Sequence, residues 1–183
     1  MLSQSILDRI DRIGSDYRLS FGQLNQEQLN FKPDSKTWSI AQNIDHIITI
    51  NTTYFAIFDG LIQGQYKTPL HGRLPFIVKF FGRFILQSVR PDRKQKIKTF
   101  PIWEPSSSDV NESLQNLMEH HEDLKNRIRS IEPYLGKRTV INSPASRKIV
   151  YTLDKALDII CTHEERHLVQ ANELKDMHFK RMS

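Results

Sequence analysis

The chain has 183 residues, of which 38% are hydrophobic and 26% charged, and its formal net charge is +5. This length and balance fit a single domain spanning residues 1–183 with a real apolar core, and they exclude a wholly disordered chain. The only cysteine, Cys161, excludes a disulfide framework within the chain and a cysteine-rich metal site.

The N-terminal segment predicts a helix over residues 3–24. Apolar residues recur there every three or four positions and form one stripe: Ile6, Ile10, Ile13, Tyr17 and Phe21. The segment lacks the basic and apolar regions of a secretory signal, so we expect a soluble, cytoplasmic protein. Residues 25–38 contain Pro33 and several polar turn formers, and they predict a loop.

A second helix is expected over residues 39–63. Ser39 with Gln42 three residues later matches a capping box, in which each side chain pairs with a backbone N–H of the other residue. The stripe that follows is Ile40, Ile44, Ile47, Asn51, Tyr54 and Phe58, and Gly60 and Gly64 mark the end.

The middle of the chain, residues 65–108, predicts an extended connection with room for one extra helix. Residues 75–89 are amphipathic, since Lys79, Arg83 and Arg90 share one face. A membrane-surface helix is one interpretation, but packing on the bundle or a dimer contact is favoured. The basic run from Arg90 to Lys98 could bind nucleic acid or anionic lipid. It lacks interleaved aromatic residues, so a solvated connector is favoured and neither nucleic acid nor membrane is expected as a partner.

Two more helices are expected, over residues 109–131 and 153–177. The stripe of the first is Val110, Leu114, Leu117, His121, Leu124 and Ile128, and Pro133 stops it. A loop through Pro144 follows, and Thr152 is a plausible N-cap for the last helix. The pattern predicts an all-α protein, an antiparallel four-helix bundle with a long crossover between the second and third helices. Such bundles commonly hold metal sites between facing helices.

The sharpest chemical feature is the pair His163 and His167. Their spacing of four puts both rings on one face of a helix, and that face continues the apolar stripe through Ile160 and Ala171. Polar groups on a buried stripe are costly without partners, and one metal ion would satisfy both rings. Hydrogen bonds to neighbours, or exposure at a bundle end, would also account for the pair.

His46, on the edge of the buried face of the second helix, completes a set of three histidines. Three neutral imidazoles suit Zn, Ni, Fe or Cu and leave at least one coordination position open for water or substrate. A bound water would have its pKa lowered towards neutrality. The set therefore predicts a divalent metal centre with His46, His163 and His167 as ligands.

Other residues compete less well for a chemical role. Among the remaining histidines His121 is the strongest alternative ligand, because it falls on a stripe; the others are His71, His120 and His178. Glu164 could orient a ligand or act as a base, although a solvated carboxylate is favoured. Asp45, next to His46, could support that ligand, although a surface position is favoured. Cys161 lacks a basic neighbour close enough on its helix to activate it.

Two segments resemble the DinB/YfiT-like metal-binding four-helix bundles. The first is KTWSIAQNIDHIITINTTYF, from Lys36 to Phe55, and the second is HEERHLVQANELK near the C-terminus. On this resemblance His46, His163 and His167 fall on the family's three ligand positions. The resemblance implies an antiparallel bundle, often a homodimer, with a divalent metal near one end. Residues 65–105 depart from the compact members and resemble an enlarged connection, and such connections commonly shape the substrate pocket.

Relatives of this kind include S-transferases that use a low-molecular-weight thiol such as bacillithiol or mycothiol, thiol-dependent isomerases and hydrolase-like proteins. The first hypothesis is therefore a metal-dependent thiol S-transferase acting on a small molecule, with Zn or Ni favoured and Fe, Mn or Cu also suitable. A metal would bind the thiol as a nucleophilic thiolate. The alternative is a metal-binding or sensing module without catalysis.

Overall fold

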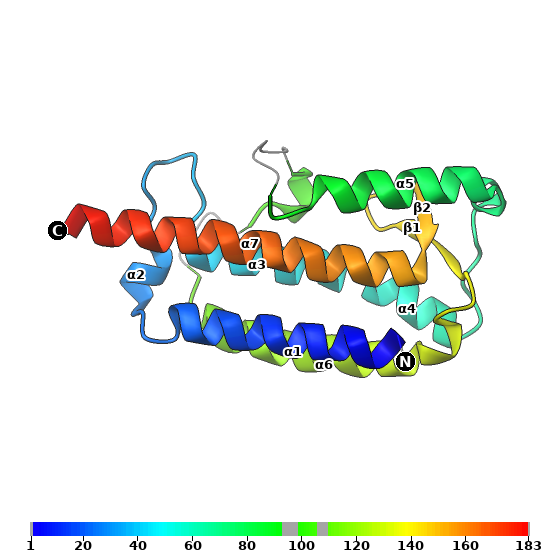
Figure 1. Cartoon of the computed structure of the whole chain (residues 1–183), viewed down its shortest axis with the longest axis horizontal. Helices are drawn as coiled ribbons and strands as arrows, with labels where there is room; N and C mark the ends of the chain where they lie inside the picture. Colours follow the sequence, from blue (N-terminus) through cyan, green and yellow to red (C-terminus); the bar gives the residue numbers. More distant parts are fainter. Residues whose placement is uncertain (1, 93–98, 106–109, 183) are drawn as a thin grey trace.

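Four long helices form a bundle in the computed structural model, which describes residues 2–92, 99–105 and 110–182 (Figure 1). They are α1 (Leu2–Phe21), α3 (Ile40–Thr52), α6 (Ser113–Ser130) and α7 (Leu153–Met182). Helix α1 packs against α6 and α7, and α3 packs against the same two helices. The expectation of a mostly helical bundle is confirmed.

The direction of the helices determines how the chain is connected. In Figure 1, α1 and α7 run one way along the bundle, while α3 and α6 run the other way. The chain must therefore return along the bundle between α3 and α6. That return contains α4 (Phe55–Ile62), the 3₁₀ turn η1 (Leu70–Arg73), α5 (Pro75–Ser88) and the 3₁₀ turn η2 (Pro101–Trp103). Most of the basic run, residues 93–98, lies outside the described residues.

The predicted second helix is divided into α3 and α4. Its capping box is present as expected: the Ser39 hydroxyl accepts from the backbone of Gln42, and the Gln42 side chain accepts from the backbone of Ser39. The division follows from two threonines, because Thr52 and Thr53 donate their hydroxyls back to the carbonyls of Ile48 and Ile50. Such bonds compete with the helical ladder.

Two elements arise where the sequence predicted only loops. The first is α2 (Gln26–Asn30), a short helix with its own capping box between Asn25 and Gln28. The second is a hairpin of β1 (Val140–Ser143) and β2 (Ser146–Thr152), which pair antiparallel with Ile141 opposite Tyr151. The all-α prediction is therefore corrected by one small sheet.

The hairpin forms because its apolar residues have a core to face. Ile141, Val150 and Tyr151 are fully buried, whereas Arg147 and Lys148 on β2 are exposed. The Tyr151 hydroxyl lies 2.8 Å from that of Tyr54, next to the start of α4. Pro144 was interpreted only as a loop residue, and its position between two short β-branched runs is a turn signal.

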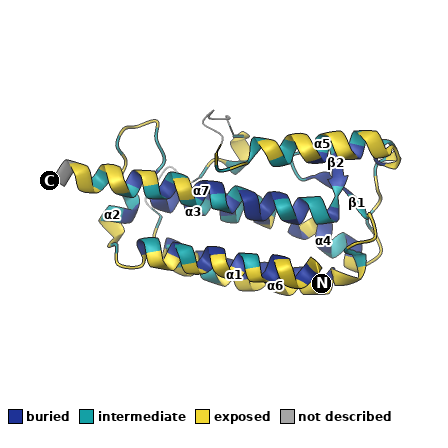
Figure 2. Cartoon of the chain, in the orientation of Figure 1, coloured by how far each residue is buried: buried dark blue, intermediate teal, exposed yellow. Residues whose placement is uncertain are grey.

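The core fills the space between the four long helices (Figure 2). The predicted stripes of α1, α3 and α6 supply much of it, and those stripe residues are almost entirely buried. The largest fully buried side chains are Tyr17, Phe21, Phe58, Tyr151, Ile10, Ile40, Ile44, Ile47, Leu117, Leu124, Ile128 and Ile131. None of the described helices combines the length and apolarity needed to cross a bilayer.

Replacing Ser39 by Ala should lower the free energy of unfolding by about 1 kcal/mol, because the first turn of α3 loses its capping bond. Urea denaturation followed by circular dichroism measures this loss. The matched control is Asn25→Ala, which removes the equivalent cap of the five-residue helix α2 and should cost less. Equal losses in the two variants would contradict the importance of the α3 cap.

Candidate metal centre

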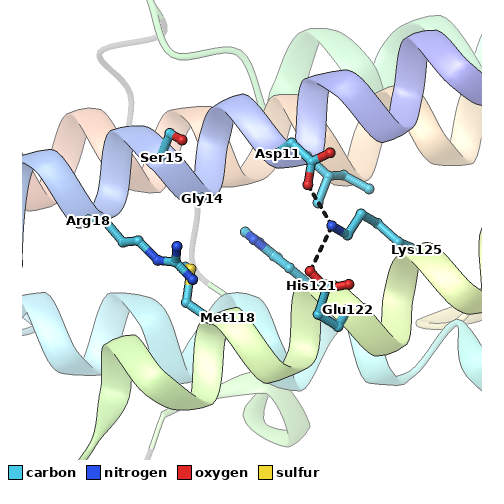
Figure 3. A pocket seen from close by; sticks show the side chains of 9 residues that line it. Asp11, Gly14, Ser15, Arg18, Met118, His121, Glu122 and Lys125 are labelled. Carbon is cyan, nitrogen blue, oxygen red and sulfur yellow. Dashed lines mark hydrogen bonds and ion pairs between the residues drawn. The ribbon is translucent and has the colours of Figure 1, made fainter.

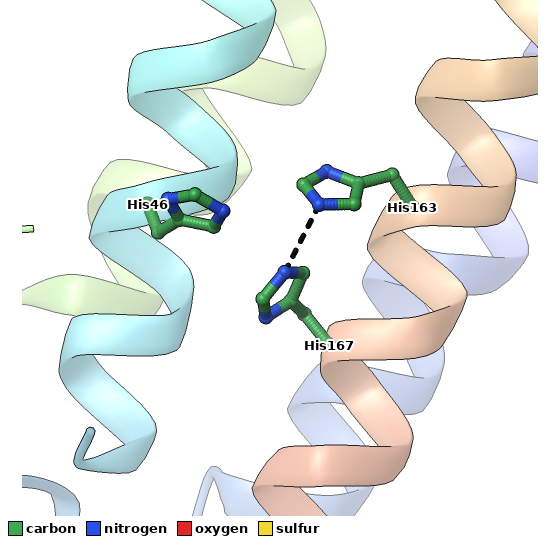
Figure 4. Close-up of side chains that lie close together, drawn as sticks. All are labelled: His46, His163 and His167. Carbon is green, nitrogen blue, oxygen red and sulfur yellow. Dashed lines mark hydrogen bonds between the residues drawn. The ribbon is translucent and has the colours of Figure 1, made fainter. Parts of the chain in front are cut away.

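His46 on α3 and the pair His163 and His167 on α7 converge in the bundle (Figure 4). One ring nitrogen from each lies within 4.8 Å of the other two. The pair is one turn apart on α7, as the sequence predicted, and α3 packs against α7 so that His46 faces the pair. The structure therefore brings together all three residues that the sequence proposed as ligands.

A chain of hydrogen bonds fixes which nitrogen of His167 carries hydrogen. The side-chain amide of Asn43 donates to the Ser39 carbonyl at 2.8 Å, so the Asn43 amide oxygen is turned towards His167. That oxygen lies 2.7 Å from Nδ1 of His167 and can only accept. Nδ1 must therefore carry the hydrogen, which leaves the Nε2 lone pair of His167 available to a metal.

The ring of His46 is oriented in the same way by a different group. Its Nδ1 lies 2.5 Å from the backbone carbonyl of Trp103, which has no hydrogen to give. Nδ1 of His46 is therefore the donor, and its Nε2 lone pair is available. The ring of Trp38 packs beside His46, with 4.7 Å between ring centroids.

The electrostatics of the cluster favour neutral imidazoles, which is the form that binds metal. Burial lowers the pKa of His46, lowers that of His163 to about 3, and lowers that of His167 well below its usual value. The neighbouring rings add to this effect in His163 and His167. The two Nε2 atoms of this pair lie only 3.1 Å apart. Three converging imidazoles, two with their lone pairs fixed, fit a divalent metal.

The cluster borders a cavity of about 1060 Å³. Its walls come mainly from residues 33–38, α3, α5, α7, the hairpin of β1 and β2, and residues 99–104, and they include Trp38, Phe84, Phe100 and Trp103. Most of the lining side chains are apolar or aromatic, and the charged ones include Glu104, Arg166 and Glu173. Three protein ligands beside such a cavity leave space for a small organic molecule at the metal.

Glu164 is not the solvent-exposed carboxylate that the sequence favoured. It is fully buried, and its carboxylate accepts from Asn51 at 2.6 Å and lies 2.9 Å from Nε2 of His121. Burial alone would raise the pKa of Glu164, but His121 and Asn51 lower it overall. The interpretation as a solvated carboxylate is wrong. Its bonds tie α7 to α3 and α6, so it is not presented to the three histidines as a base.

The remaining candidates lie apart from the cluster. His121 is buried against Glu164 and lines a hollow of about 170 Å³ between α1 and α6, where Lys125 bridges Asp11 and Glu122 (Figure 3). None of the three clustered histidines lines that hollow.

Four other residues that the sequence considered for a chemical role have neighbours of their own outside the cluster. His71 contacts the Lys148 carbonyl, and His178 packs beside Phe31. Burial raises the pKa of Cys161, which makes a reactive thiolate unfavourable, and Asp45 is half-buried on α3.

Two groups that position the cluster were missed from the sequence. Asn43 was not singled out, although its place three residues before His46 on the same helix was a signal. Trp103 lies 57 residues from His46 in the sequence. It acts through its backbone, so no side-chain pattern could have identified it.

Comparisons with known proteins agree with this geometry. Residues 9–171 match the sequence model of the DinB superfamily. The uncharacterized protein YuaE from Bacillus subtilis (strain 168) is 28% identical over 160 residues, which cover 84% of this chain and 86% of YuaE. The structure of YfiT from Bacillus subtilis superposes with a TM-score of 0.63 at 14% identity, over 97% of this chain and 87% of YfiT. YfiT is described as a probable metal-dependent hydrolase with an unusual four-helix bundle topology.

Replacing Asn43 by Ala should weaken metal binding by about 10- to 100-fold, because Nδ1 of His167 loses the acceptor that fixes its ring. Competition with a chromophoric chelator measures the affinity. Asn43→Asp is the matched control, since it keeps an acceptor for Nδ1 and should retain most of the affinity. Equal weakening in both variants would show that the acceptor does not matter.

His120 should make the fold sensitive to acid. Burial lowers its pKa to about 4, whereas the unfolded chain takes up the proton near pH 6.5. Stability is therefore lost as pH falls from about 6.5 towards 4, and at pH 5 this loss is about 2 kcal/mol.

His120→Leu should remove that loss while keeping an apolar contact with Phe55, whose ring stacks on His120. Urea unfolding with chelator present is measured at pH 5 and pH 8, and the pH 8 value gives the cost of the substitution itself. The prediction fails if the variant loses as much stability between the two pH values as the original chain.

Proposed function

The chain belongs to the DinB superfamily, and we propose that it is a metal-dependent enzyme in which His46, His163 and His167 hold one divalent ion. The observation that carries this proposal is the position of the cluster. Its ring nitrogens converge at the border of a large, mostly apolar cavity. Three protein ligands with space beside them are typical of a catalytic rather than a closed structural site.

We favour Zn or Ni as the ion, while Fe, Mn and Cu also suit imidazole ligands. When bound, such an ion supplies a Lewis acid that lowers the pKa of a thiol or a water held beside it. Other residues of the chain orient the ligands and shape the space beside them. Asn43 and the Trp103 carbonyl orient two of the rings, and aromatic side chains form part of the wall beside the reacting groups.

Transfer of a low-molecular-weight thiol to an electrophilic small molecule is the reaction we propose. Its sulfur would form a bond to an electrophilic carbon, and the leaving group would depart into the cavity. The thiol proton would pass to solvent, which a free thiol pKa of about 8.5 permits, so this chemistry needs no protein base. Within the described residues the metal-binding group contains no carboxylate, and Glu164 is already bound to Asn51 and His121.

Hydrolysis is the second candidate, and the description of YfiT as a probable metal-dependent hydrolase favours it. The same centre would then activate water in place of a thiol. Water as nucleophile needs a proton acceptor, and Glu104 and Glu173 are the glutamates that line the cavity. The two reactions differ in their requirement for an added thiol, which makes them separable by assay.

His163→Ala should reduce the metal content of protein purified without a histidine tag from about one ion per chain to well below half. The loss follows because two imidazoles alone hold a divalent ion weakly. Elemental analysis by mass spectrometry measures it. The control is His178→Ala, which changes a histidine outside the cluster and should keep the full content. Unchanged metal in His163→Ala would remove the basis of the proposed centre.

Metal-loaded protein should join a thiol to a chromogenic electrophile such as chlorodinitrobenzene, and Glu104→Gln and Glu173→Gln should retain this activity within a few-fold. Absorbance of the thioether product reports the rate, with His163→Ala as the inactive control. Turnover of an ester without any thiol, abolished by a glutamate variant, would favour hydrolysis instead. No turnover of either kind at full metal occupancy would favour a binding or sensing module.

A further inference from the structure

Helix α5 presents a ridge of phenylalanines to solvent. Phe76, Phe80 and Phe84 are spaced by four and so lie on one side of the helix, with 69%, 63% and 56% of their surfaces exposed. The rings of Phe80 and Phe84 stack on each other with 6.2 Å between centroids. Leu70 and Leu74, just before the helix, are also exposed. Three exposed phenylalanines on one side of a helix indicate an interaction site.

The opposite side of α5 is firmly packed, so the ridge is not an alternative core face. Val78 and Gly82 are buried there. A side chain at Gly82 would come within 3.0 Å of Lys155 and 3.3 Å of Tyr151, so α5 lies very close to α7 and β2. Figure 2 shows the helix at the edge of the molecule with its outer side exposed. Its inner side fixes the direction in which the phenylalanines point.

The segment that carries the ridge is positively charged. Residues 60–91 contain no Asp or Glu, but they contain five basic residues: Lys67, Arg73, Lys79, Arg83 and Arg90. Arg73, Lys79 and Arg83 are exposed, and within the described residues they form no ion pair. Lys79 and Arg83 are one turn apart and flank the ridge. A partner that fits this face must therefore be both apolar and anionic.

We propose that the ridge of α5, with Lys79 and Arg83, docks on the surface of an anionic lipid bilayer. Phenylalanines can insert at the boundary of headgroups and acyl chains while basic side chains reach the anionic headgroups. A second copy fits less well, because the identical face of a twofold partner carries the same basic residues and residues 60–91 contain no carboxylate to pair with them. The expected packing of this helix on the bundle is confirmed for its inner side. The proposal concerns the outer side, and there it replaces the expectation of no membrane partner.

Docking would also bring the cavity close to the lipid. Phe84 belongs to the ridge and also lines the cavity, together with Ile85, Ser88 and Val89 from the same helix. A molecule that partitions into the bilayer would then have a short path to the three histidines. The docking proposal rests on α5 alone, so it can be tested without metal and without any assay of activity.

The test is co-sedimentation of the full chain with sucrose-loaded vesicles at 100 mM salt. Vesicles of 70% phosphatidylcholine and 30% phosphatidylglycerol should bind the chain, and vesicles of pure phosphatidylcholine should bind it far more weakly. The double variant K79Q/R83Q should bind the anionic vesicles roughly 25-fold less, since each basic residue contributes roughly fivefold. The double variant F80S/F84S should lose at least about tenfold.

Matched controls use residues far from α5 that are just as exposed. Leu19→Ser removes an apolar side chain that is 82% exposed on α1, and R12Q/R18Q removes two exposed charges from the same helix. Both should bind like the original chain, apart from a small effect of net charge. Because all of these side chains are exposed, circular dichroism should show every variant to be folded.

Three outcomes would overturn the proposal. One is equal binding to neutral and anionic vesicles by all variants. A second is loss of binding with the charge variant but not with F80S/F84S, because the ridge would then not insert. The third is no vesicle binding together with a dimer, detected by analytical ultracentrifugation, that F80S/F84S dissociates. In that case the ridge is a contact between copies of the chain.

Discussion

The packing of α3 against α7 is the contact on which the rest of the site depends. Two histidines one turn apart can be encoded within a single helix, but the third ligand has to come from elsewhere in the fold. The contact places His46 opposite the pair and Asn43 beside His167. The apolar stripe of α3 holds it in place, since Ile40, Ile44 and Ile47 are all buried. The same burial that stabilises the bundle also keeps the imidazoles neutral.

A buried polar group lies deeper in the bundle and reinforces this arrangement. Glu164, next to His163 in sequence, joins α7 to Asn51 on α3 and to His121 on α6. A carboxylate in such a place is costly unless its partners are well placed, so these bonds favour one position of α7 relative to α3 and α6. That position in turn determines where His163 and His167 point. Glu164 therefore supports the metal site indirectly, by holding α7 in place.

Some of this structure follows from sequence periodicity and some does not. The stripes predicted four helices, the capping box at Ser39 predicted the start of α3, and helical spacing placed His163 and His167 on one face. Glu164 was misplaced because a one-face pattern assumes that α7 has an outer polar side. Helix α7 packs against α1, α3 and α5, so it is buried over more than one face. The hairpin and Trp103 were missed for a related reason, since both depend on distant parts of the chain.

The bundle helices and the connection between α4 and α6 contribute differently to the site. The bundle helices supply the three histidines and Asn43, whereas the return between α4 and α6 supplies Phe84, Phe100 and Trp103 to the cavity. Ligand geometry is thus determined by helix packing, which tolerates little change without loss of the core. Part of the cavity wall, by contrast, comes from a connection, where substitutions cost less stability. Changes in that connection can therefore alter what reaches the metal while the three ligands stay in place. The exception is the Trp103 carbonyl, which links the connection to the orientation of His46.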